Sequence, residues 1–278
     1  MTDDSGSAAR SDRSGARGRE WDAATYHQVS DPHVVWGTRV LDRLPLSGDE
    51  TVADAGCGTG RLTALLLERL PRGQVIAIDA SANMLETAAA SLTPRFGDRV
   101  RFVQTDLQIL TLPHPVDAIF STATFHWIPD HPLLFRHLLA ALRPGGRLAA
   151  QCGGGPNLAA LRHRTATLTA TPRFAPNFDG WAGPWEFADA DVTATRLHDA
   201  GFVEVETSIE AAPTVLPDAA AYRNFLTSVI FGAHLERLPD DETKAAFVDE
   251  LTRQAAGDDP PFSLDYWRLN LGARRPMA

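Results

Sequence analysis

The apolar residues of this chain gather into short runs, separated by longer stretches in which apolar and polar positions follow a helical period. Turn residues such as Gly, Pro and Asp bound each run, which is typical of buried strands. Strands that alternate with helices in this rhythm predict a doubly wound α/β sheet. The first five strands are expected at residues 51–55, 74–79, 100–106, 117–122 and 147–152.

The rhythm breaks after the fifth predicted strand and returns later in the chain. Residues 153–188 mix prolines and aromatic residues around a short helical stretch, which favours a cap or substrate lid. A helix at 190–200 and a strand at 202–209 resume the sheet pattern. Residues 219–256 have the pattern of two further helices, and the alternating strand 264–273 completes seven strands. The sequence therefore predicts one sheet with a helical cap built from two insertions.

A glycine-rich turn follows the first predicted strand. The stretch DAGCGTGR, which begins at Asp54, places Gly56, Gly58 and Gly60 at every second position directly before a leucine-rich helix. Glycines permit a tight turn and leave no Cβ between the backbone and a ligand, and the N–H groups of the helix N-terminus suit an anionic group. A dinucleotide fingerprint needs its third glycine one residue later, where Arg61 stands. The spacing therefore argues against a nicotinamide cofactor.

Acidic residues end the next two predicted strands. Asp79 closes the strand 74–79, 25 positions after Asp54, and Asp106 closes the strand 100–106. The stretch STATFHW, residues 121–127, leaves the fourth strand at the edge where open α/β sheets bind ligands. The sequence thus predicts one ligand site along the carboxyl ends of the first four strands.

Charge and cysteine content narrow the function. The formal net charge of the 278 residues is −9, from 26 basic and 35 acidic residues, which disfavours nucleic acid as a partner. Cys57 and Cys152 are too few for a disulfide framework or a Cys-rich zinc site, and no metal-ligand spacing occurs, so no metal is expected. The sequence has neither an 18-residue apolar segment nor a signal-peptide core. We expect a cytoplasmic protein with no membrane partner.

The pattern Asp54-x-Gly56-x-Gly58-x-Gly60 with Asp79 resembles motif I and the following acid of the class I S-adenosylmethionine-dependent methyltransferases. The resemblance implies a Rossmann-like methyltransferase sheet and S-adenosyl-L-methionine as cofactor, with S-adenosyl-L-homocysteine as product. It also implies that the glycine loop holds the methionyl part, Asp79 the ribose and Asp106 the adenine. The residues assigned to the cofactor in this way are Tyr26, Asp54, Gly56, Cys57, Gly58, Gly60, Asp79, Ala80, Met84, Asp106, Leu107 and Ser121.

Further motifs are similar to those of the trans-aconitate methyltransferase group. They are Trp21-Asp22, IDAS-x-x-M at 78–84, FHW-x-x-D at 125–130 and LRPGGRLAAQ at 142–151. That group tends to carry a W-V-K-G-T type segment near its substrate, whereas this chain has SVIFG at 228–232, without a cation. The resemblance therefore does not specify aconitate as the acceptor.

These observations predict a methyltransferase that acts on a small molecule, by O-methylation of a carboxylate. A carboxylate is already ionised at pH 7 and needs no general base. His126 is the candidate for substrate orientation or for a base, and Trp127, Arg164 and Arg173 are candidates for substrate contact. Alternatives are a carboxyl methyltransferase of malonyl-acyl-carrier protein, a natural-product O- or C-methyltransferase, and a cofactor-binding protein without catalysis.

The predicted elements also suggest a division of the chain. We expect a disordered tail at 1–19 because it lacks apolar residues that could form a core. The cofactor-binding half then spans 20–152. The remaining parts are a cap segment at 153–188, a helix and strand of the core sheet at 189–212, a second cap segment at 213–260, and the last strand with a tail at 261–278.

Overall fold

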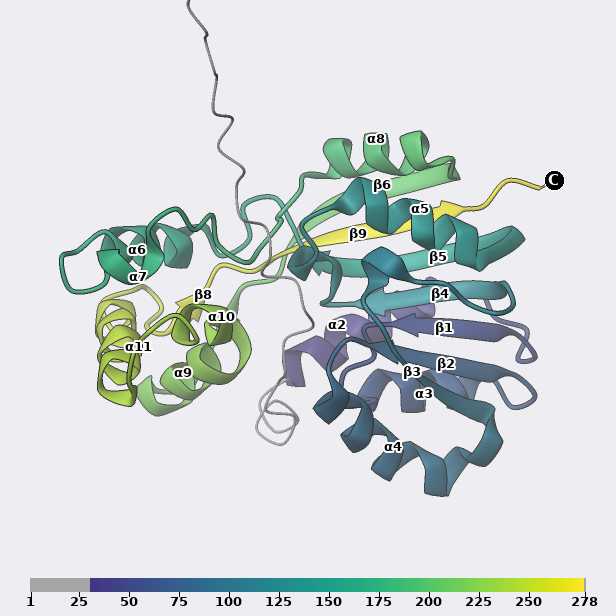
Figure 1. Cartoon of the computed structure of the whole chain (residues 1–278), viewed down its shortest axis with the longest axis horizontal. Helices are drawn as coiled ribbons and strands as arrows, with labels where there is room; N and C mark the ends of the chain where they lie inside the picture. The colour runs from purple at the N-terminus through teal and green to yellow at the C-terminus, as the bar shows by residue number, and fades with distance from the viewer. Residues whose placement is uncertain (1–30, 278) are drawn as a thin grey trace, which may run out of the picture.

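The computed structural model of the protein describes residues 31–277. The expected tail at 1–19 and Tyr26 lie outside the described residues. A central sheet carries helices on both faces, and a second group of helices lies beside one end of the sheet (Figure 1). Within the described chain, no helix combines the length and the apolar composition that a membrane span requires.

The predicted seven-stranded α/β sheet is confirmed. Its strand order is β3-β2-β1-β4-β5-β9-β6, with parallel pairing from β3 to β5. The last strand of the sheet in chain order, β9, pairs antiparallel with both β5 and β6 and so lies between them. The strands are β1 (Thr51–Ala55), β2 (Gln74–Asp79), β3 (Val100–Gln104), β4 (Val116–Thr122), β5 (Leu142–Gly153), β6 (Val203–Ala211) and β9 (Trp267–Arg274).

Helices cover the two faces of this sheet because each buries one apolar side against it. The core on one face includes Leu66 and Leu67, and the core on the other face includes Leu134 and Leu138. The first face is covered by α2 (Asp31–Asp42), α3 (Arg61–Arg69) and α4 (Ala82–Phe96), and the second by α5 (His131–Ala141) and α8 (Ala190–Ala200).

The second group of helices, which we call the cap, has its own core. Tyr222, Phe225, Phe231 and Phe247 are almost completely buried there, and each such side chain stabilises the fold by about 1.5–3 kcal/mol. The cap consists of α6 (Ala159–Thr169), α7 (Ala175–Phe178), α9 (Ala219–Phe225), α10 (Gly232–Leu235), α11 (Asp241–Ala255) and the small sheet of β7 (Thr214–Val215) and β8 (Ser263–Leu264).

Two features bring the cap to the ligand edge of the sheet. The parallel strands end on the side that faces the cap (Figure 1), so the loops after β1, β2 and β4 point towards it. In addition, α9 continues into a single π-helical turn at Leu226–Ile230, and this turn carries Val229 and Ile230. Such turns re-aim side chains and occur often at functional sites.

Candidate cofactor and acceptor site

The glycine loop after β1 is fixed to the neighbouring strand. The N–H groups of Gly56 and Cys57 both donate to the carbonyl oxygen of Ile78 in β2, at 2.8 and 2.9 Å. Gly56, Gly58 and Gly60 have φ angles of 84°, 54° and 81°, a region that favours glycine. The predicted tight turn between strand and helix is therefore present.

The three glycines have different environments. A Cβ on Gly56 would lie 2.1 Å from Oγ1 of Thr124, and a Cβ on Gly60 would lie 2.7 Å from Cδ1 of Leu92. A Cβ on Gly58 would meet no atom within 4 Å. Gly56 and Gly60 are thus required by packing, whereas Gly58 exposes bare backbone to the open space in front of the loop, where a ligand can approach.

The carboxylate of Asp79 joins the glycine loop to the end of β2. Its Oδ2 accepts from the N–H of Gly58 and its Oδ1 accepts from the N–H of Ser81, both at 2.9 Å. The Ser81 hydroxyl in turn caps α4 by accepting from the N–H of Met84, whose side chain is buried. Ala80 lies half-buried in the same turn. The structure thus brings Gly58, Asp79, Ala80 and Met84 together.

Asp54 is the buried acid of the site. Its Oδ2 accepts a 2.6 Å hydrogen bond from the hydroxyl of Thr63. Burial and, to a smaller extent, the nearby charge of Asp79 raise the pKa of Asp54 to about 7, against the opposing effect of the Thr63 hydrogen bond. Burial likewise keeps the pKa of the adjacent Cys57 thiol well above its ordinary value, so this thiol stays protonated. Asp54 can therefore take up or release a proton near neutral pH.

A pocket of about 450 Å³ lies in front of the glycine loop, and we call it the cofactor pocket. Asp106 follows β3 by two residues and lies two strands away from the loop. Its Oδ1 accepts from the N–H of Gln108 at 2.8 Å and caps a short turn that contains the buried Leu107. The residues that line the pocket are Val34, Asp54, Gly56, Cys57, Gly58, Thr59, Arg61, Leu62, Thr122 and Ala123.

The exit of β4 connects this pocket to a second one. The hydroxyl of Ser121 donates to the carbonyl oxygen of Ala55 at 2.6 Å, which fixes β4 against β1. Ala123 then adopts a φ of 55° while its N–H donates to the carbonyl oxygen of Gln151. Ala123 lines both pockets, so the two spaces meet at this residue.

The second pocket, which we call the acceptor pocket, has a volume of about 410 Å³ and lies between the sheet and the cap. Trp127 and Trp185 have ring centroids 6.1 Å apart, and the rings of Trp185 and Phe187 are stacked at 5.7 Å. The lining residues are Ala123, His126, Trp127, Asn157, Leu158, Trp185, Phe187, Val229, Ile230, Tyr266 and Arg268.

His126 lies in this pocket with its imidazole stacked on Phe187. Its Nδ1 accepts a 3.2 Å hydrogen bond from the N–H of Gly153. In the neutral imidazole that this bond requires, the proton is on Nε2. Nε2 of His126 is therefore a donor, and the two candidate roles of this residue, substrate orientation and general base, stay predictions.

A partly buried network holds the turn that carries His126 and Trp127. Nε2 of His131 contacts the carbonyl oxygen of Phe125 at 3.0 Å, and Nη1 of Arg196 contacts Nδ1 of His131 at 3.1 Å. Arg196 also pairs with Glu186, whose own N–H donates to the carbonyl oxygen of His126. Burial lowers the pKa of His131, so this residue acts as a neutral support. Sequence reasoning missed the network because its members come from three separate elements.

The two arginines expected at the substrate lie elsewhere. Arg164 forms a two-point ion pair with Asp258 within the cap, with 2.8 Å between Nη1 and Oδ2, and this hydrogen bonding raises the pKa of Arg164. Arg173 lies over the ring of Phe174 at 5.5 Å. Neither side chain is among the residues that line the acceptor pocket, so the structure does not bring these two arginines to it.

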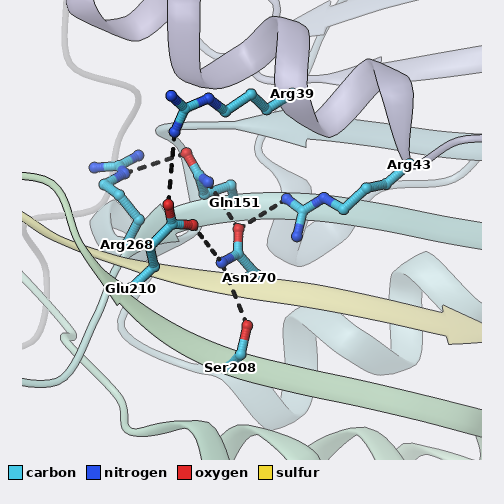
Figure 2. Close-up of polar contacts among 7 residues, drawn as sticks. All are labelled: Arg39, Arg43, Gln151, Ser208, Glu210, Arg268 and Asn270. Atoms are coloured by element: carbon cyan, nitrogen blue, oxygen red, sulfur yellow. Dashed lines mark hydrogen bonds and ion pairs between the residues drawn. The ribbon is translucent and has the colours of Figure 1, made fainter.

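The acceptor pocket is lined instead by Arg268, a residue of β9 that sequence reasoning did not select. Its side chain is buried, with the guanidinium 4.6 Å above the ring of Trp36 and Nε donating to Oε1 of Gln151 at 3.3 Å. Figure 2 shows that this contact is one end of a polar cluster across β5, β9 and β6. Nε2 of Gln151 donates to Oδ1 of Asn270 at 2.7 Å, and Arg43 donates to the same oxygen at 2.8 Å.

The rest of this cluster fixes Asn270 from the other side. Nδ2 of Asn270 faces Oε2 of Glu210 at 3.5 Å and Oγ of Ser208 at 3.4 Å, and Glu210 pairs with Arg39 (Figure 2). The hydrogen-bonded chain from Asn270 through Gln151 to Arg268 restricts the Arg268 side chain. A guanidinium held in this way presents a rigid fork of donors that matches a carboxylate.

Comparison with known proteins agrees with the fold. Residues 52–146 match a family model described as "Methyltransferase domain". A trans-aconitate 2-methyltransferase of Methylobacterium nodulans is 33% identical over 92% of this chain and 98% of its own length. A protein of the same name from Azoarcus sp. is 42% identical over 47% of this chain, and that match covers 50% of the relative.

Among solved structures, a phosphoethanolamine N-methyltransferase of Haemonchus contortus, bound to phosphomonomethylethanolamine and S-adenosylhomocysteine, resembles the fold with a TM-score of 0.60 at 16% identity. The match covers 92% of this chain and 57% of that chain. The chain belongs to the class I S-adenosylmethionine-dependent methyltransferases. Within this class it belongs to the family of the trans-aconitate 2-methyltransferases, as the relative matched over nearly its whole length shows.

The family makes this chain a small-molecule methyltransferase that uses S-adenosylmethionine. The cofactor pocket fits that molecule, because Gly58 leaves room for close backbone approach and Asp79 places an acceptor for hydroxyl groups next to it. Across residues 31–277, His, Cys, Asp and Glu form no group that could hold a metal ion.

Proposed function

We propose that this enzyme is a carboxyl O-methyltransferase that converts a small carboxylic acid into its methyl ester. The observation that carries the proposal is the buried guanidinium of Arg268 in the acceptor pocket, which meets the cofactor pocket at Ala123. Arg is the side chain best suited to bind a carboxylate in a fixed orientation. The relatives named trans-aconitate 2-methyltransferase support a carboxylic acid as the class of acceptor.

The cofactor supplies a methyl group on a positively charged sulfur. We propose that Gly58 and Asp54 bind its methionyl part, that Asp79 accepts from the ribose hydroxyls, and that Asp106 with Leu107 binds adenine. Among these contacts, Asp79 already has its carboxylate at the glycine loop. The protein's contribution is then mainly to hold the two substrates in line, since proximity and orientation alone lower the barrier of a two-substrate reaction substantially.

The transfer requires no proton movement. An oxygen of the acceptor carboxylate forms a bond to the methyl carbon, the bond between that carbon and sulfur breaks, and the electron pair stays on sulfur. A carboxylic acid with an ordinary pKa near 4 is ionised at pH 7, so no general base is needed. This agrees with the geometry of His126, whose Nδ1 accepts from the Gly153 N–H and whose remaining role is to donate.

The proposal is tested with a panel of acceptors that includes mono-, di- and tricarboxylates, phenols and amines. We expect formation of S-adenosylhomocysteine with carboxylates, together with a product that gains one methyl group by mass spectrometry. Mild alkali should release methanol from this product, because esters hydrolyse under conditions that leave methyl ethers and methylamines intact. Methylation confined to phenols, amines or carbon atoms would overturn the proposal and leave the general methyltransferase assignment.

A further inference from the structure

The walls of the acceptor pocket are mostly aromatic and aliphatic. The rings of Trp185 and Phe187 lie nearly parallel, with 15° between their planes, and Trp127 packs against Trp185. The opposite side is supplied by Val229 and Ile230 of the π-helical turn, both of which are buried. Flat apolar groups gain burial and favourable ring contacts against such walls.

Apart from the hydroxyl of Tyr266, the polar side chains that line the pocket present N–H donors. Arg268 has donors only. Oδ1 of Asn157 already accepts from the N–H of Trp267 at 2.8 Å, and Nδ1 of His126 already accepts from the N–H of Gly153. The polar hydrogens of these two side chains are therefore those of an amide N–H in Asn157 and of an imidazole N–H in His126. Donors suit a carboxylate and disfavour an ammonium group.

The placement of charge limits how many carboxylates fit. Among the described residues that line the pocket, Arg268 is the cation, and it lies on the sheet side. The other described lining residues carry no positive charge, so a second or third carboxylate on the same acceptor would be buried without a cationic partner, which is unfavourable. Val229 and Ile230 belong to the segment 228–232, at which the sequence departs from the trans-aconitate methyltransferase pattern.

On the basis of the proposed carboxyl methylation, we infer that the acceptor is a monocarboxylate with a flat, apolar body. Its carboxylate binds the guanidinium of Arg268, and its body lies against the wall that the rings of Trp127, Trp185 and Phe187 form together. This acceptor class differs from the tricarboxylate in the names of the relatives. Arg268 binds the charged group of the acceptor, and the aromatic rings with the π-helical turn determine which apolar bodies fit.

The first test compares two unsaturated carboxylates of similar reach, cinnamate and trans-aconitate, with cinnamyl alcohol as a neutral acceptor. We expect kcat/KM for cinnamate to exceed that for trans-aconitate by roughly 30-fold or more, since about 2 kcal/mol for one unpaired carboxylate corresponds to that factor. Binding is measured independently of turnover from the quenching of Trp fluorescence. Cinnamate should bind in this assay and trans-aconitate should bind much more weakly.

Two pairs of variants test which residues determine the affinity for cinnamate and the preference over trans-aconitate. Arg268→Gln should raise KM and Kd for cinnamate about 30-fold while the affinity for S-adenosylmethionine stays constant. Arg164→Gln removes an arginine of the cap that lies outside the pocket and should leave both constants unchanged. Ile230→Lys places a cation in the apolar wall and should shift the kcat/KM ratio towards trans-aconitate about tenfold, whereas Ile109→Lys, at an exposed isoleucine, should not shift it.

The possible outcomes separate this inference from the proposed function. Esterification of trans-aconitate in preference to cinnamate would overturn the inference and leave carboxyl methylation standing. Methylation of cinnamyl alcohol without methylation of either acid would overturn both. Failure of cinnamate to bind the folded wild-type protein, or unchanged binding in Arg268→Gln, would also overturn the inference, even if no acceptor in the panel turns over.

Discussion

The cofactor pocket and the acceptor pocket are built in different ways. The cofactor pocket uses backbone N–H groups and short side chains from segments close together in sequence, chiefly residues 54–62. The acceptor pocket uses large side chains from residues as far apart as Ala123 and Arg268. The first therefore depends on local backbone geometry, and the second depends on how the cap packs against the sheet. This difference predicts that substitutions in the glycine loop affect cofactor binding without altering the acceptor pocket.

The largest expected effect is that of Gly58→Val. The new side chain would occupy the open space in front of the loop, so we expect binding of S-adenosylmethionine to be abolished. A non-glycine residue at a φ of 54° also costs about 1–2 kcal/mol of stability, which should lower Tm by several degrees without unfolding the protein. Calorimetric titration and thermal melting measure the two effects.

Gly97→Val is the matched control for this variant. Gly97 has the same φ of 54°, and a Cβ there would also meet no atom within 4 Å, but it lies at the far end of α4. We expect this control to lose stability and to bind the cofactor normally. Normal cofactor binding by Gly58→Val would show that the loop is only a structural turn.

The next effect in size is that of Asp79→Ala. The substitution removes a carboxylate that we expect to accept two hydrogen bonds from the ribose, each contributing about 1.5–3 kcal/mol before compensation by water. It also leaves the N–H groups of Gly58 and Ser81 without this acceptor. Calorimetry should show at least a tenfold loss of cofactor affinity, while cinnamate still quenches Trp fluorescence in the acceptor pocket.

Asp98→Ala serves as the control, because Asp98 is an exposed acid remote from both pockets. It should bind the cofactor as the wild type does. If Asp79→Ala bound the cofactor with wild-type affinity, the assignment of Asp79 to the ribose would be wrong. If it lost cofactor and cinnamate binding together, the two pockets would not be independent.

The last expected effect is on stability and not on ligand binding, and it concerns pH and Asp54. Its pKa rises from an ordinary value of 3.8 to about 7 in the folded protein. Between these values the folded chain keeps a proton that the unfolded chain releases, so the free energy of unfolding contributed by this group falls as pH rises, by up to about 1.4 kcal/mol per pH unit. Asp54→Asn has no such proton and should gain stability relative to the wild type from pH 4.5 to pH 7.

Urea unfolding of the cofactor-free protein at several pH values measures this difference. Asp98→Asn, which changes an exposed acid, should follow the wild-type curve across the same range. Parallel curves for Asp54→Asn and the wild type would mean that Asp54 is already ionised in the folded state. The cofactor pocket would then bind its ligand with a permanent negative charge at Asp54.

The sequence predicted the sheet well because local patterns determine it. Buried parallel strands give continuous apolar runs, and the acids Asp54, Asp79 and Asp106 mark where those runs stop. The glycine spacing also identified the loop correctly. Sequence alone could not divide the glycines by role, because Thr124 and Leu92, which exclude a Cβ at Gly56 and Gly60, are brought there by tertiary packing.

The acceptor pocket was harder to predict for a physical reason. In the strand 264–273, Arg268 and Asn270 alternate with leucines, a pattern that normally indicates a solvent-facing side. Because β9 pairs with both β5 and β6, it is an interior strand, and α2 covers its Arg268 and Asn270 through Trp36 and Arg43. Both polar residues are therefore buried. Two polar residues in such a strand are a signal of a site only when the strand order is known.

The position of β9 also determines when the sheet can be completed during synthesis of the chain. During synthesis, β5 leaves the ribosome early and pairs with β4, whereas β6 emerges with its partner β9 still to be translated. Until β9 arrives, β5 and β6 both present unpaired edges, which are the surfaces through which nascent chains associate wrongly. Completion of the sheet and delivery of Arg268 to the acceptor pocket are consequently one event, so a chain that stalls before Trp267 lacks both.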